Sequence, residues 1–353
     1  METVTHILSG ALVARAIAPN VLSRDAQRKA GLTVGAATLC GAAAAAFPDI
    51  DIVANIFGQL TYLLNHRGIT HSLIVLPLWA LLFALLARQR QNWLAFYPYA
   101  FAGLLIHVLG DLITSYGTMI LTPFSNARFE WGTTFIFDFW LSGIIIVGLL
   151  LSWRWRHSRL PALAALVAVV GYIGFQAVLK ERAIDAGQAY ARTNGHNGAI
   201  VNAMPQPFSP FRWMVVVKNA DVYWYTHINL LHQEEALPAA APGGGWFARF
   251  SANFRSVDQA LWQRVDQFGG TPQEAMLSRH AFDQPGFAFY RWFATYPALY
   301  RIDRNQDGHC VWFQDLRFKF PGLERPTFRF GMCSSGNTWV PVRWVSEGVR
   351  NTL

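Results

Sequence analysis

The sequence predicts a mainly α-helical polytopic membrane bundle of about five to six membrane helices, followed by a smaller, β-rich α+β domain outside the cytoplasm. The composition is the first reason, because 53% of the 353 residues are hydrophobic and only 14% are charged, which is unusual for a soluble protein. The second reason is the uneven distribution of charge. Residues 1–179 hold 11 Lys and Arg with 7 Asp and Glu, whereas residues 180–353 hold 18 and 14. We therefore expect a membrane domain over 1–179 and a water-soluble domain over 180–353.

The membrane helices are predicted from apolar length. A bilayer core needs roughly 20 apolar residues per helix and tolerates about 17. Five stretches meet this requirement, at residues 31–47, 69–87, 93–113, 135–153 and 160–179. A sixth stretch, residues 7–18, is shorter and is followed by Pro19, so it is either a marginal span or a helix buried among the others. It lacks the basic start and the cleavage site of a signal peptide.

The orientation follows from Lys and Arg in the short loops. The loops at 19–30, 88–92 and 153–159 are rich in these residues, whereas the loops at 48–68 and 114–133 carry only Arg67 and Arg128. The positive-inside rule places the first set in the cytoplasm and the second set, both termini and residues 180–353 outside. The net charge of +8 contains no basic run, so no nucleic-acid partner is expected.

The outer domain is expected to combine strands and helices. Residues 211–225 and 287–320 are dense in aromatic and β-branched side chains, whereas 257–268 and 272–280 have helical patterns. Cys310 and Cys333 both fall in this domain, where disulfides persist, and whether they pair is left open. Cys40 lies within an apolar stretch and is expected to be a small packing residue.

Ionisable side chains are concentrated where the apolar segments end. The motifs are Asp49-x-Asp51, His66-x4-His71 and His107-x3-Asp111, with His6 at the start of the first helix. Asp and His beside hydrocarbon are costly unless something binds them, and metal ions commonly bind this mixture. In the predicted topology all seven residues lie at the outer side. The sequence therefore predicts a metal site at that depth.

Each motif also has a plainer interpretation. His107 and Asp111 share one helical face and could simply form a hydrogen bond with each other within the bundle. Asp49 and Asp51, expected to face one way in an extended turn, could belong to a solvated loop. His6 alone could be a core histidine, and Arg67 could either bind an anion or extend to the lipid headgroups.

Four motifs together carry a resemblance to a known family. They are Thr5-His6-x3-Gly10, Pro48-Asp49-Ile50-Asp51, His66-Arg67-Gly68-x-Thr70-His71-Ser72 and His107-x3-Asp111, all within the first 125 residues. In this order they resemble the bacterial inner-membrane family of predicted metal-dependent hydrolases (YdjM-like), which is thought to be distantly similar to zinc-dependent phospholipase C and S1/P1 nuclease. The resemblance implies an inner (plasma) membrane location, phosphoester hydrolysis and zinc. The second His-x3-Glu helix of the soluble enzymes has no clear counterpart here, and His6 is the residue that could replace it.

These features predict a membrane-bound, phospholipase-C-like hydrolase that cleaves a lipid or other amphipathic phosphoester with metal-activated water. The predicted metal ligands are His6, Asp49, Asp51, His66, His71, His107 and Asp111, with two zinc ions expected and one to three compatible with the set. Asp51 or Asp49 would bridge the ions and orient or deprotonate the water, and Arg67 would bind the phosphate.

The alternative is a metal-binding transporter or scaffold without hydrolytic activity. A metallopeptidase is disfavoured because no His-Glu-x2-His motif occurs. The substrate, the metal and the oligomeric state are left open.

Overall fold

The computed structural model describes residues 1–18, 32–87, 93–231, 245–305, 308–321, 328–336, 338–346 and 349–352. The chain divides into two compact units, Met1–Val178 and Leu179–Leu353. The basic loops expected at 19–30 and 88–92 lie outside the described residues.

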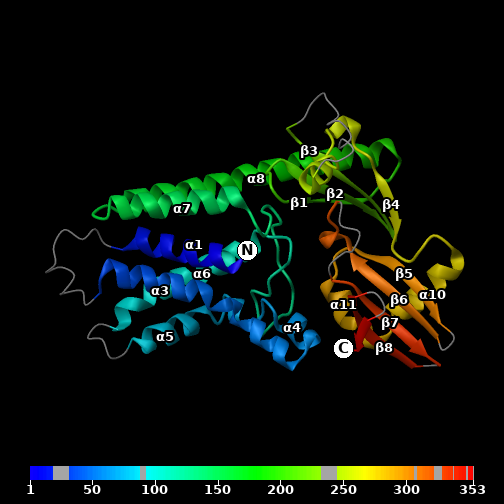
Figure 1. Cartoon of the computed structure of the whole chain (residues 1–353), viewed down its shortest axis with the longest axis horizontal. Helices are drawn as coiled ribbons and strands as arrows, with labels where there is room; N and C mark the ends of the chain where they lie inside the picture. Colours follow the sequence, from blue (N-terminus) through cyan, green and yellow to red (C-terminus); the bar gives the residue numbers. More distant parts are fainter. Residues whose placement is uncertain are drawn as a thin grey trace. The chain divides into compact units, whose positions relative to one another are not determined.

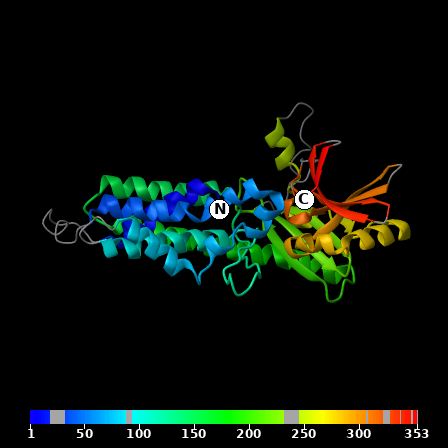
Figure 2. The same ribbon diagram turned by 90° about the horizontal axis from the view of Figure 1, so that it is seen from below.

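The first unit is helical. Its elements are α1 (Thr3–Ile17), α3 (Val34–Ala46), η1 (Pro48–Phe57), α4 (Gln59–Asn65), η2 (Ile69–His71), α5 (Leu76–Leu86), η3 (Trp93–Phe96), α6 (Tyr97–Leu112), α7 (Phe139–Arg154) and the first part of α8 (Leu160–Thr193). Figures 1 and 2 show α1, α3, α5 and α6 side by side, with α7 and α8 along α1. The six long helices alternate in direction, so the starts of α1 and α7 and the ends of α3 and α6 lie at one end of the bundle (Figure 1).

Fewer helices qualify as membrane spans than the five to six predicted. Within the described residues, three helices are long and apolar enough, namely Val34–Phe57, Trp93–Leu112 and Leu160–Thr193. A fourth span results if Gln59–His71 and Leu76–Leu86, which are bent by 76° at a short break, count as one.

The predicted span at 135–153 and the marginal stretch at 7–18 both form short helices. The helix α1 has 15 residues and α7 has 16, which gives roughly 23 Å against the roughly 30 Å of a bilayer core. The predicted span at 135–153 is shortened because Asp138 caps α7 and accepts hydrogen bonds from the backbone N–H groups of Trp140 and Leu141.

Glycines allow α1, α3 and α6 to approach closely. A Cβ atom at Gly103 of α6 would lie 2.3 Å from the carbonyl oxygen of Gly41 on α3, and one at Gly10 of α1 would lie 2.4 Å from the same oxygen. Small residues permit such contacts between membrane helices. The packing therefore brings together the helices that carry His6, His107 and Asp111.

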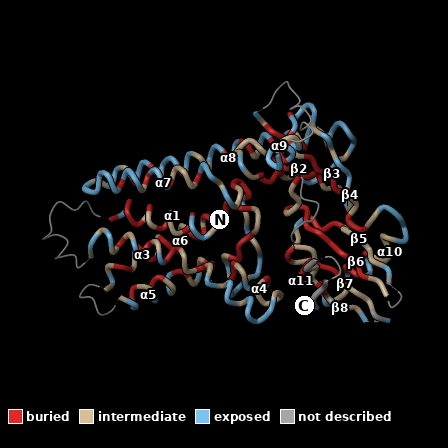
Figure 3. Tube along the Cα trace, viewed as in Figure 1, coloured by how far each residue is buried: buried red, intermediate tan, exposed pale blue. Residues whose placement is uncertain are grey.

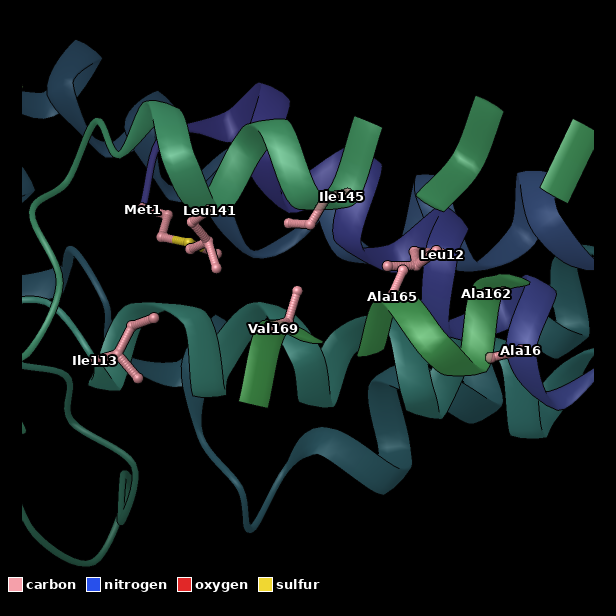
Figure 4. Close-up of a cluster of buried hydrophobic side chains, with 9 residues drawn as sticks. All are labelled: Met1, Leu12, Ala16, Ile113, Leu141, Ile145, Ala162, Ala165 and Val169. Carbon is pink, nitrogen blue, oxygen red and sulfur yellow. The ribbon is translucent and has the colours of Figure 1, made fainter. Parts of the chain in front are cut away.

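A hydrophobic cluster holds α7 and α8 against α1. Its buried members, drawn in Figure 4, are Met1, Leu12, Ala16, Ile113, Leu141, Ile145, Ala162, Ala165 and Val169. The opposite faces of α7 and α8 are exposed (Figure 3), and they carry apolar residues such as Leu150 and Val167. An exposed apolar face suits contact with lipid.

A polar network ties the end of α6 to α8. The backbone N–H groups of Thr133 and Thr134 donate to the carbonyl oxygen of Ile113, and the Thr134 hydroxyl donates to Gln176 on α8. Gln176 and Tyr172 in turn donate to Asp138. This network anchors the segment that follows Asp111.

The second unit contains the end of α8 and two antiparallel sheets, as the predicted β-rich domain requires. One sheet has the order β1 (Ile200–Pro205), β2 (Arg212–Asn219), β3 (Val222–Asn229) and β4 (Gln263–Asp266). The other has the order β5 (Pro297–Asn305), β6 (Gly308–Asp315), β7 (Phe330–Ser335), β8 (Thr338–Ser346) and β9 (Val349–Thr352). The helices are α9 (Trp246–Ser251), α10 (Pro272–Phe282) and α11 (Ala288–Phe293), with the 3-10 turns η4 (Val257–Gln259), η5 (Pro285–Phe287) and η6 (Leu316–Phe318).

One predicted helix of this unit is wrong. Residues 257–268 form η4 and β4, because Val265 pairs with Tyr223 and packs in the sheet core, so sheet pairing overrides the helical pattern. The helix predicted at 272–280 is confirmed as α10, which begins with a Thr271–Glu274 capping box. Cys310 and Cys333 lie directly opposite each other on β6 and β7 and form a disulfide.

Candidate metal centre

The structure brings all seven predicted ligand residues into one connected cluster in the first unit. His6 is on α1, Asp49 and Asp51 are on η1, His66 follows α4, His71 ends η2, and His107 and Asp111 are in the last turns of α6. His6, His71, His107 and Asp111 are fully buried. Asp111 is at the centre, because all three of these imidazoles approach its carboxylate.

The two carboxylates of the Asp-x-Asp motif point to different partners, which corrects the expectation that they face one way. Pro48 begins the 3-10 helix η1, in which successive residues are about 120° apart. Asp49 consequently faces α1 and α6, accepting a hydrogen bond from the Thr3 hydroxyl at 2.6 Å and lying 3.6 Å from His107 Nε2. Asp51 instead faces the segment around Arg67.

Three ligand atoms have the spacing expected around one ion. The Nε2 atoms of His71 and His107 are 3.0 Å apart, and they lie 3.1 Å and 3.6 Å from the Oδ2 atom of Asp111. Ligands 2.0–2.1 Å from a tetrahedral zinc ion are separated by about 3.3 Å. The three observed separations bracket this value, so the residues fit a divalent ion.

The hydrogen bonding of this trio leaves Asp111 Oδ2 and His107 Nε2 able to bind an ion. Oδ2 of Asp111 accepts no hydrogen bond from the described residues, although His71 Nε2 lies 3.1 Å away. His107 Nδ1 donates to the carbonyl oxygen of Ala45 at 2.6 Å. This hydrogen bond fixes the tautomer of His107 and leaves Nε2 with a lone pair for an ion.

A second group of possible ligands adjoins the first. His6, Asp49 and His107 place one ligand atom each within 4.8 Å of one another. His107 has only Nε2 to offer, so it can serve one ion and not two. Asp111, by contrast, presents Oδ1 to His6 Nε2 at 3.2 Å and Oδ2 to His71 Nε2 at 3.1 Å. Asp111 therefore contacts the histidines of both groups through different oxygens.

Asp51 lies behind His66 and His71 and is hydrogen-bonded to His66. Its Oδ1 atom is 2.9 Å from His66 Nδ1, and its Oδ2 atom is 3.6 Å from His71 Nδ1 and accepts a hydrogen bond from the Arg67 backbone N–H at 2.8 Å. A carboxylate on the far ring nitrogen is the usual support for a metal-binding histidine. The hydrogen-bond partner of His71 Nδ1 is the Thr70 hydroxyl, 2.9 Å away.

Arg67 is buried and contacts Asp111. Its Nη2 atom lies 2.8 Å from Asp111 Oδ1, and Nη1 donates to the Thr114 hydroxyl at 3.0 Å. Its side chain is only 4% exposed, so the interpretation that it extends to the lipid headgroups is wrong. The Met1 amino group also lies 2.5 Å from Asp111 Oδ1. Two cationic groups thus already accompany this buried carboxylate.

Some functional contacts could not be read from motifs. The acceptor for His107 is the main chain of Ala45, so no side chain signals it. Thr3 and Thr114 lie near the predicted ligands in sequence, but a lone threonine is too common to single out. The backbone of Arg67 has a positive φ of 60°, which turns the chain between His66 and His71. The two histidines therefore do not stand on one continuous helix.

Comparison with known proteins gives the family but no reaction. Residues 1–183 match the family described as "YdjM inner membrane protein". The sequence is also similar to "Uncharacterized protein YfhP" of Bacillus subtilis (strain 168), with 26% identity over 186 residues, 52% of this chain and 55% of that protein. The chain therefore spans about half the length of this curated relative. No solved structure matches. Because the family match covers more than half of the sequence and includes every predicted ligand, the chain belongs to the YdjM inner membrane protein family.

Proposed function

We propose that the chain is a metal-dependent hydrolase of the inner membrane that cleaves a phosphoester in a lipid or another amphipathic molecule. The observation that carries this proposal is the buried trio of His71, His107 and Asp111, whose ligand atoms are 3.0–3.6 Å apart. A mixed imidazole and carboxylate set of this kind favours zinc among the common ions. When bound, such an ion acts as a Lewis acid and lowers the pKa of water from 15.7 towards roughly 7.

The ligands divide into two neighbouring positions. His71, His107 and Oδ2 of Asp111 would hold one ion, and His6 and Asp49 would hold a second. Two divalent ions against the carboxylates of Asp49 and Asp111 leave a net positive charge, which Arg67 increases. A positive site attracts a phosphate anion.

Asp49 is the better candidate for the base among the two carboxylates of η1. It is 21% exposed and lines a cavity beside the cluster. Both oxygens of Asp51 are occupied, by His66 and by the backbone of Arg67. Asp49 would accept a proton from water, Asp51 would keep the histidines oriented, and Arg67 would contact the phosphate.

The test is metal analysis together with hydrolysis assays on a panel of phospholipids, lipid phosphates and nucleotide esters. Wild-type protein purified without chelator is expected to hold stoichiometric metal. Asp49→Asn should retain the ion at His71, His107 and Asp111 and lose turnover, whereas Asp51→Asn should lower metal affinity by roughly 10- to 100-fold, the usual effect of removing such a support. Asp138→Asn, at a half-buried carboxylate of the same unit that contacts none of the ligands, is the control for loss of a structural carboxylate.

The alternative is metal binding for transport or scaffolding, and the same protein distinguishes it. Metal-loaded protein that hydrolyses none of these esters, but moves metal across proteoliposome membranes in a manner that depends on His107, would replace the hydrolase proposal. Wild-type protein without stoichiometric metal would reject both.

The site is proposed to face the extracytoplasmic side. The alternating helices carry the ligands at one end of the bundle, and the basic connection between α7 and α8 lies at the opposite end (Figure 1), in line with the positive-inside rule. A fusion at the C-terminus to a reporter that fluoresces only in the cytoplasm is expected to stay dark. A bright reporter would show that the orientation is the reverse of the one proposed.

A further inference from the structure

We propose that the cavity beside the metal cluster is an acyl-chain subsite, in which Ala43, Ala46, Phe47 and Phe83 hold one hydrocarbon chain of the substrate while its phosphate lies at Arg67. This inference rests on the proposed function and adds to it the part of the site that recognises the chain. It names residues that determine specificity and take no part in binding metal.

The cavity has a volume of about 580 Å³ and two chemically different parts. One part is polar and is formed by Asp49, Tyr62, His66 and Arg67, which belong to the cluster or adjoin it. The rest of the wall is mostly apolar, formed by Ala43, Ala46, Phe47, Ile50, Ile52, Phe83 and Ile136. A small hydrophilic phosphoester would leave this apolar wall unused, whereas an amphipathic one would cover both parts.

The apolar part lies between two membrane helices. Ala43 and Ala46 are three residues apart on α3 and so share a face, and Phe83 comes from α5. The rings of Phe47 and Phe83 meet edge to face at 5.4 Å between centroids. Two alanines on this face leave space that larger side chains would fill.

The cavity is open to the apolar surface of the unit. Ala43, Ile50 and Ile52 all line it and are exposed, the two isoleucines at 52% and 61%. Since α3 and η1 together form one of the candidate spans, this opening faces the region where hydrocarbon is expected. A chain can therefore enter from the bilayer without passing through water.

The experiment measures binding of inorganic phosphate, butyl phosphate, hexyl phosphate and octyl phosphate to the metal-loaded full chain in nanodiscs. Burying each CH₂ group is worth about 0.8 kcal/mol, or roughly fourfold in affinity. We expect affinity to rise by two- to fourfold per CH₂ in the wild type. Ala43→Phe should abolish this rise while leaving bound metal and the affinity for inorganic phosphate unchanged.

Two further variants complete the test. Ala46→Leu fills the same space from the neighbouring turn and should also flatten the chain-length dependence, which covers the case in which Ala43→Phe folds poorly. Leu39→Phe is the matched control, because Leu39 is 70% exposed on the same helix and does not line the cavity. It should behave as the wild type does.

The outcomes separate the subsite from the hydrolase. Affinity that is independent of chain length, or a rise that persists in both cavity variants, overturns the subsite even if the protein hydrolyses phosphoesters. A chain-length rise lost in the cavity variants supports the subsite even if no ester is turned over, in which case only the proposed reaction fails.

Discussion

Replacing Gly103 by alanine tests whether the close packing of α1, α3 and α6 sets the geometry of the metal site. The new Cβ would lie 2.3 Å from the carbonyl oxygen of Gly41 and 3.1 Å from its Cα and carbonyl carbon. These are backbone atoms, so no side chain can rotate away. Ordinary contact begins near 3.4 Å, and α6 must therefore move by roughly 1 Å relative to α3.

Such a movement reaches the ligands directly. His107 is one turn beyond Gly103 on α6, and its Nδ1 is hydrogen-bonded to Ala45 on α3. Metal sites tolerate errors of about 0.2 Å in ligand distance, so a displacement of this size should remove most bound metal. Overpacking of this kind also costs about 1–3 kcal/mol of stability.

The assay is metal stoichiometry together with thermal unfolding in detergent. Gly143→Ala on α7 is the matched control, because a Cβ there meets nothing within 4 Å, and alanine favours a helix over glycine by up to about 1 kcal/mol. The control should keep its metal and be as stable as the wild type or slightly more so. A Gly103→Ala protein with wild-type metal content and wild-type stability would refute the reasoning.

Three further predictions concern single contacts. Asp111→Ala leaves the buried guanidinium of Arg67 unpaired, so chemical unfolding in detergent should show a loss of about 3–5 kcal/mol. Adding Arg67→Met to Asp111→Ala should recover part of that loss. If the stability losses of the two single variants simply add in the double variant, the pairing is contradicted. In the second unit, burial and the nearby Lys319 lower the pKa of His227 to about 4. Because the unfolded chain then binds a proton more readily, stability is complete above about pH 6.5 and falls by roughly 2–3 kcal/mol as the pH decreases to about 4. Unfolding measured over this range should show the loss of stability in the wild type and not in His227→Phe. If the stability of both proteins falls equally with decreasing pH, His227 is not the source of the loss. Mass spectrometry of unreduced peptides should find Cys310 linked to Cys333, and recovery of both as alkylated thiols would disprove the link.

The sequence predicted which residues form the cluster better than it predicted where each side chain points. Asp, His and Arg at the ends of apolar segments are conspicuous, and the structure gathers them around Asp111. The direction of each side chain depended on local backbone geometry that spacing does not contain. The 3-10 form of η1 separates Asp49 from Asp51, and the positive φ of Arg67 separates His66 from His71.

Helix lengths and one element type were mispredicted for similar reasons. The apolar stretch at 135–153 looked long enough to cross the membrane, but Asp138 uses its carboxylate to cap α7 within it. The segment containing Val265 has a helical pattern, yet pairing with Tyr223 on β3 makes it a strand. Apolar length and periodicity report what a segment could form alone, whereas caps and partner strands decide what it forms in the fold.

The hydrogen bond from His107 to the carbonyl oxygen of Ala45 means that the histidines of the cluster differ in how easily a mutation elsewhere removes their support. A main-chain acceptor survives every substitution of its own residue, so the ring of His107 cannot lose its support through a single exchange at position 45 unless the helix itself is disturbed. His66 depends on the carboxylate of Asp51, which a single base change can remove. Substitution of Asp51 should therefore remove the support of His66 directly, whereas substitution of the buried Ala45, which packs against Gly10 of α1, should affect His107 only by displacing α3 from α1.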